Sequence, residues 1–122
     1  IKNYVLYFKN MRIKKYNKLV RDKIPEICLK NNATPEVRIA KDDKEYRLYL
    51  QKKIREEARE VAKEKDIDKL KDEIADLVEV SNCLIKTLGI SKKEVEKIRK
   101  EKNEKRGSFH KRLILLKTKE KK

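Results

Sequence analysis

Glycine, cysteine and histidine are all scarce in this 122-residue chain, and each shortage excludes a class of site. Two glycines cannot build a phosphate-cradling loop such as G-x-G-x-x-G or G-x-x-x-x-G-K-[ST]. A single histidine excludes a multi-histidine metal site and argues against a Ser-His-Asp device. The two cysteines, Cys28 and Cys83, lie far apart without a partner motif. We therefore expect reduced, buried thiols in a cytoplasmic protein.

Long apolar runs are also missing from the sequence. No run approaches 18 apolar residues, so we expect no membrane partner. The length fits one domain, which we place at residues 11–116, followed by a basic tail at 117–122. Because Met11 is the only methionine, we expect residues 1–10 to be an extension whose removal leaves folding and activity intact.

Charge is plentiful but unevenly distributed along the chain. The formal net charge is +15, yet the stretch from Asp42 to Glu79 holds 13 acids and 10 bases, a net of −3, so the remainder carries +18. An acidic centre between basic flanks would suit a complex of a metal ion with a polyphosphate. The alternative is a composition that is merely rich in lysine and glutamate, as in some thermophilic proteins.

Caps and breakers predict an all-α fold, a bundle of about four helices. Proline in a first turn, Asp or Ser followed three residues later by Glu, and glycine after an apolar stretch mark the helix ends. The helices are expected from Pro25 to about Lys30, from Asp42 to about Lys65, from Asp66 or Asp68 to Leu88, and from Ser91 to Gly107. Two short apolar stretches, Val37–Ala40 and Leu113–Leu116, could pair as a minor two-stranded β element.

Several carboxylates fall on helix faces that should turn towards the core. At about 100° per residue, Glu57 lies in the apolar sector of the second predicted helix, Glu60 lies at its edge and Glu56 further out. That sector is formed by Tyr46, Leu50, Ile54 and Val61. On the third predicted helix, Glu73 and Asp76 point among or beside apolar neighbours. The apolar side there is formed by Leu70, Ile74, Leu77, Val78, Leu84, Ile85 and Leu88.

These four carboxylates form two pairs with matched spacing, Glu57 with Glu60 and Glu73 with Asp76. Residues three apart are neighbours on a helix surface, so the pairs would converge if the two helices form an antiparallel hairpin. An unpaired buried carboxylate is costly, and a cluster of oxygens suits a hard cation such as Mg²⁺, with Mn²⁺ as a possible substitute. The alternative is neutralisation by neighbouring bases, namely Lys52, Lys53, Arg55, Arg59 and Lys69.

Three motifs together resemble one enzyme family. Glu56-Glu57-Ala58-Arg59-Glu60, twelve intervening residues and Glu73-Ile74-Ala75-Asp76 look like E-E-x-x-E…E-x-x-D, the signature of the all-α nucleoside triphosphate pyrophosphohydrolases (MazG-like and phosphoribosyl-ATP pyrophosphohydrolase-like). The run from Tyr16 to Pro25, YNKLVRDKIP, is similar to the N-terminal signature of a house-cleaning subfamily. Arg106-Gly107-Ser108-Phe109 resembles its R-G-G-F element, with Ser108 in place of the second glycine.

The resemblance covers roughly Tyr16 to Leu116 and implies Mg²⁺-dependent cleavage of a nucleoside triphosphate into a monophosphate and pyrophosphate. It implies four metal ligands, Glu57, Glu60, Glu73 and Asp76, and makes Glu56 the candidate to orient or deprotonate the attacking water. Basic side chains would stabilise the departing pyrophosphate, unless they are merely solvated. The candidates are Lys18, Arg21, Lys23, Lys102 and Arg106, while Asp22 either pairs with a base or contacts the substrate.

The family also implies a homodimer or higher homo-oligomer.

Two interpretations compete with the enzyme: a basic helical module that binds nucleic acid without catalysis, and the same fold with catalysis lost. With no recognisable helix-turn-helix and 6% aromatic residues, nucleic acid is the weaker candidate as a partner. The nucleotide that serves as substrate is not encoded in any motif of this sequence.

Overall fold

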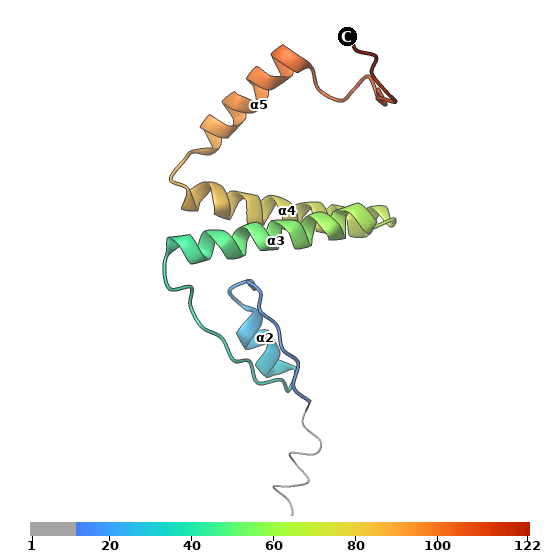
Figure 1. Ribbon diagram of the computed structural model, residues 1–122. Helices are drawn as coiled ribbons and strands as arrows, with labels where there is room; N and C mark the ends of the chain where they lie inside the picture. Colours follow the sequence, from blue (N-terminus) through green and yellow to red (C-terminus); the bar gives the residue numbers. More distant parts are fainter. Residues whose placement is uncertain (1–11) are drawn as a thin grey trace, which may run out of the picture.

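The computed structural model describes residues 12–122, so the expectation about residues 1–10 lies outside the described part of the chain (Figure 1). Within it, the predicted all-α fold of about four helices is confirmed. The helices are α2 (Ile24–Lys30), α3 (Asp43–Lys63), α4 (Ile67–Thr87) and α5 (Lys92–Arg106). Every helix end lies within two residues of its predicted position.

The start of α3 differs in one detail from the predicted capping box. The Asp42 carboxylate accepts the backbone N–H of Glu45 at 2.8 Å, as expected of a cap. The Glu45 carboxylate, however, accepts the backbone N–H of Lys41 at 3.1 Å and pairs with Arg38 at 2.5 Å. Only the Asp42 hydrogen bond of the capping box is therefore formed. The Glu45 carboxylate instead binds the segment that leads into α3, through Arg38 and Lys41.

The other caps follow the sequence prediction. Asp66 caps α4 by accepting the backbone N–H groups of Asp68 and Lys69. At α5 both hydrogen bonds of the Ser91–Glu94 capping box are present. These caps fix where the chain enters α4 and α5.

The packed part of the described chain is an antiparallel hairpin of α3 and α4, which run side by side in Figure 1. Leu50 of α3 is 1% exposed and Val80 of α4 is 9% exposed, and they are the two buried apolar side chains between residues 12 and 122. The third buried residue is Glu57. The small core therefore holds a carboxylate as well as apolar groups.

The predicted apolar side of α4 is only partly correct. Val80, rather than Ile74 or Val78, is buried, and these two remain 46% and 52% exposed. Helix α3 covers only a narrow stripe of α4, the one that contains Val80. The apolar stripe formed by Ile74 and Val78 lies on another face of α4 and is left open in residues 12–122. Cys28 and Cys83 are free thiols as expected, but half-buried instead of buried.

The predicted β element is absent: neither Val37–Ala40 nor Leu113–Leu116 forms a strand in the described structure. Figure 1 gives the reason, because the α2–α3 connection and the segment after α5 lie on opposite sides of the α3–α4 hairpin. Ile39 is 92% exposed and Leu116 is 87% exposed. Each predicted strand is thus present as an apolar segment that lacks its partner.

The chain exposes far more surface than a compact protein of its size. Its accessible surface is 12497 Å², whereas a folded monomer of 14.6 kDa is expected to expose about 6,900 Å². Helix α5 stands away from the hairpin in Figure 1 and contributes to this excess. None of the helices between residues 12 and 122 is both long enough and apolar enough to cross a bilayer.

Candidate functional site

Three of the four predicted metal ligands meet across the hairpin. Glu57 of α3 and Glu73 and Asp76 of α4 each place one carboxylate oxygen within 4.8 Å of the others. The i, i+3 spacing of Glu73 and Asp76 sets both on one face of α4, and the antiparallel packing brings that face to Glu57. This arrangement is the convergence that the sequence predicted for two paired helices.

Glu60, the fourth predicted ligand, faces the same region but has another partner. Its carboxylate lies 3.1 Å from the Lys63 ammonium, one turn further along α3. Its negative charge nevertheless acts on Glu73 and helps to raise the pKa of that carboxyl group. Glu60 therefore lies beside the triad of Glu57, Glu73 and Asp76 without belonging to it.

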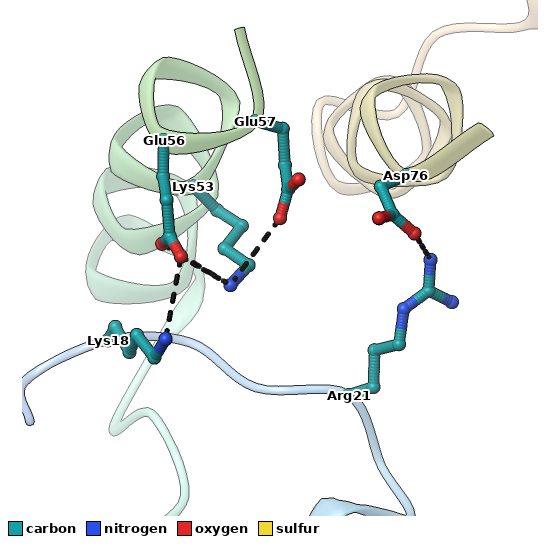
Figure 2. Close-up of polar contacts among 6 residues, drawn as sticks. All are labelled: Lys18, Arg21, Lys53, Glu56, Glu57 and Asp76. Carbon is teal, nitrogen blue, oxygen red and sulfur yellow. Dashed lines mark hydrogen bonds and ion pairs between the residues drawn. The ribbon is translucent and has the colours of Figure 1, made fainter. Parts of the chain in front are cut away.

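Lys53 joins the predicted catalytic carboxylate to the triad. Its ammonium lies 3.3 Å from Glu56 and 3.6 Å from Glu57, and its side chain is only 15% exposed. The spacings are i, i+3 and i, i+4 along α3, which place these side chains on adjoining faces (Figure 2). Neutralisation by a neighbouring base, the alternative interpretation, thus applies to these two carboxylates.

The N-terminal signature crosses the hairpin and contacts both of its helices. The Arg21 guanidinium lies 2.7 Å from Asp76 of α4, and the Lys18 ammonium lies 3.5 Å from Glu56 of α3 (Figure 2). Near these contacts, the Tyr49 hydroxyl donates to the Asn17 side-chain oxygen at 2.8 Å. Lys18 and Arg21 thereby reach carboxylates that lie 38 and 55 positions away in sequence.

Glu73 differs from the other carboxylates of the cluster because no cation among residues 12–122 lies within ion-pair distance of it. Partial burial raises its pKa above the ordinary value, and the charges of Glu60, Asp76 and Glu57 raise it further. At Glu56 partial burial also acts upward, but hydrogen bonds and charge from Lys53 and Lys18 hold its pKa below the ordinary value. The negative charge that lacks compensation is therefore centred on Glu73.

This pKa shift predicts how metal binding depends on pH. If the triad binds a divalent ion, that ion would have to displace the proton from Glu73, so its affinity should fall as the pH is lowered through the raised pKa of this group. We expect the fall in Mn²⁺ affinity, measured by titration calorimetry between about pH 4 and pH 7, to begin at a higher pH than an ordinary glutamate would give. Glu73→Gln should abolish that step, and an unchanged pH profile in this variant would contradict the assignment.

The raised pKa of Glu73 also affects the stability of the metal-free fold, and this effect has the opposite dependence on pH. The pKa of Glu73 is higher in the folded chain than in the unfolded chain, so the folded state holds the proton more tightly. Stability should consequently decrease as the pH rises through this window. Bound cations would reverse that trend.

Several predicted substrate residues are not brought to the cluster. Lys102 and Arg106 lie on α5, away from the hairpin in Figure 1. Lys23 is at the start of α2 and forms no ion pair within the described residues. Asp22 lies close enough to Tyr46 for its charge to help raise the pKa of that hydroxyl, after burial and Cys83.

Two features of the site were missed or undervalued from the sequence. From the sequence alone, Lys53 is named only as one of several bases that could neutralise the carboxylates. Its i, i+3 and i, i+4 spacing from Glu56 and Glu57 predicts these two ion pairs. The contact of Asn17 with Tyr49 has no such signal, since it depends on tertiary structure.

Comparison of the chain with family models, curated proteins and solved structures found no match.

Proposed function

We propose that the protein is a Mg²⁺-dependent pyrophosphohydrolase that cleaves a nucleoside triphosphate to a monophosphate and pyrophosphate. One observation carries the proposal: carboxylate oxygens of Glu57, Glu73 and Asp76 gather from two helices within 4.8 Å of one another. The motif resemblance supplies the substrate class, and the helical geometry supports only the metal site.

The residues fit a hard divalent cation. The donors are carboxylate oxygens only, with no nitrogen or sulfur in the triad, and Glu73 carries charge that no described base compensates. Glu57, Glu73 and Asp76 would hold the ion, with Glu60 adjacent. When bound, Mg²⁺ would neutralise charge on phosphate oxygens and lower the pKa of a coordinated water.

Arg21 and Lys53 shape how the site would act. Arg21 lies on Asp76, so a cation that takes this carboxylate competes with the guanidinium. A released Arg21 could bind phosphate oxygens in bidentate fashion. Glu56, whose pKa Lys53 and Lys18 lower, would be the group that orients or deprotonates the attacking water.

A panel of canonical and damaged nucleoside triphosphates, with phosphoribosyl-ATP included, tests the proposal. We expect at least one member to release pyrophosphate and the matching monophosphate with Mg²⁺ or Mn²⁺, and none to react after chelation. Absence of turnover throughout, combined with nucleic-acid binding that weakens steeply with salt, would favour the basic binding module instead.

We also propose that the chain works as a homodimer. A stable interface removes about 800 Å² from each partner, and the chain exposes thousands of square ångströms beyond a compact monomer of its mass. The open apolar stripe of α4, with Ile74 and Val78, offers a surface for that purpose. A sedimentation measurement that finds only monomer would contradict the dimer, and it would leave the proposed pyrophosphohydrolase reaction unaffected.

A further inference from the structure

Among residues 12–122, Lys53 is the most deeply buried of the cations that contact the carboxylate cluster. Its side chain is 15% exposed, whereas those of Lys18 and Arg21 are 43% and 59% exposed. A lysine is rarely buried unless it is paired, and the Lys53 ammonium is paired twice, at 3.3 Å from Glu56 and 3.6 Å from Glu57. Lys53 is therefore a fixed part of the site, while Lys18 and Arg21 are exposed enough to exchange their carboxylates for water.

Glu57 links the Lys53 ammonium to the triad. Figure 2 shows Glu57 between Lys53 and Asp76, and a Glu57 oxygen lies within 4.8 Å of oxygens of Glu73 and Asp76. In two-metal sites the ions lie about 3.5–4 Å apart, so neighbouring carboxylates serve both ions. Lys53 thus places a single positive charge on the side of Glu57 where a second ion would find its ligands.

The formal charges at the site balance for one divalent ion. The triad and Glu56 are four carboxylates with a charge of −4, and Glu60 is neutralised by its own lysine. Lys53 and Lys18 return +2 through their contacts with Glu56. The remaining −2 equals the charge of one divalent ion, once that ion has displaced Arg21. Before a nucleotide binds, a second ion would leave positive charge without compensation.

We propose that Lys53 takes the place of a second divalent cation, so that the site binds one ion. The ammonium would neutralise charge shared by Glu56 and Glu57, and it would leave the triad to hold the ion. Because Lys53 is covalently fixed to α3, this charge needs no free metal. The inference rests on the proposed function, and it states how many ions that site takes and which residue sets the number.

The number of bound Mn²⁺ ions, measured by titration calorimetry, tests the role of Lys53. We expect one ion per chain in the wild type and two in both Lys53→Met and Lys53→Gln, with helical circular dichroism unchanged. Without Lys53 the four carboxylates keep their charge of −4, which two divalent ions neutralise once Lys18 is also displaced. Lys53→Arg retains the charge and should bind one ion, as in the wild type.

Electron paramagnetic resonance provides a second measurement that a merely structural role of Lys53 would not change. Two Mn²⁺ ions about 3.5–4 Å apart are close enough for their spins to couple. We expect the spectrum of a coupled pair from Lys53→Met and that of an isolated ion from the wild type. An isolated-ion spectrum from both neutral variants, with one ion bound, would overturn the proposal.

Lys63→Met is the matched control for the loss of charge. Lys63 also pairs with a glutamate of α3 at i, i+3 spacing, Glu60 at 3.1 Å, but it is 69% exposed. This variant should bind one ion, and two ions would show that net charge rather than Lys53 sets the number. Two ions in the wild type would overturn the inference and leave the metal site standing. A wild type that binds no ion would overturn both, whereas a chain that binds one ion without turnover would contradict the reaction alone.

Discussion

Replacing Glu57 with glutamine, or Asp76 with asparagine, should lower Mg²⁺-dependent pyrophosphate release by about 10²–10³-fold. Either amide keeps the shape of the side chain but removes one of the three charges that would hold the ion. The fold should survive, because Lys53 retains Glu56 as an ion-pair partner and Arg21 is exposed enough to be solvated. Initial rates of pyrophosphate release, with circular dichroism as the test of folding, measure both expectations.

Asp72→Asn provides the matched control for this prediction. Asp72 lies on α4 one turn before Asp76, is exposed, and lies outside the carboxylate triad. Its turnover should stay within about twofold of wild type, since exposed substitutions away from a site have small effects. If Asp72→Asn lost as much activity as Asp76→Asn, general charge rather than a metal site would be responsible. If Glu57→Gln kept full activity, the metal assignment would be wrong.

Local rules predicted the helices well because those rules act within a few residues. Ser91 with Glu94, Asp66 and the glycines place the helix ends through backbone hydrogen bonds that the neighbouring sequence supplies. The convergence of Glu57 with Asp76 also followed from local periodicity, once α3 and α4 were paired as an antiparallel hairpin.

What the sequence left open depends on contacts between distant segments. The pairing of Arg21 with Asp76 joins residues 55 positions apart, and no periodicity encodes it. Likewise, the burial of Val80 instead of Ile74 depends on how α4 is rotated against α3. The strand pairing of Val37–Ala40 was plausible from composition, but the direction of α5 prevents it within one chain.

Replacing Leu50 with alanine should lower the free energy of unfolding by about 2–5 kcal/mol. Leu50 is the only fully buried large side chain among residues 12–122, at 1% exposure, so its loss leaves a cavity at the centre of the hairpin. Since small domains are stable by about 5–15 kcal/mol, this single change removes a large share. Urea unfolding followed by helical circular dichroism, at several protein concentrations because of the proposed dimer, measures the effect.

Leu48→Ala is the matched control, since Leu48 is on the same helix but 48% exposed. We expect it to cost less than half of the Leu50→Ala effect, and equal costs would show that the α3–α4 contact is not the core of the fold. Leu50 and Glu57 are seven residues apart and therefore lie on the same side of α3. The packing of α3 on α4 also brings a carboxylate oxygen of Glu57 within 4.8 Å of one of Asp76. Leu50→Ala should thus weaken Mn²⁺ binding even where most molecules remain folded, which links the small core directly to the proposed metal site.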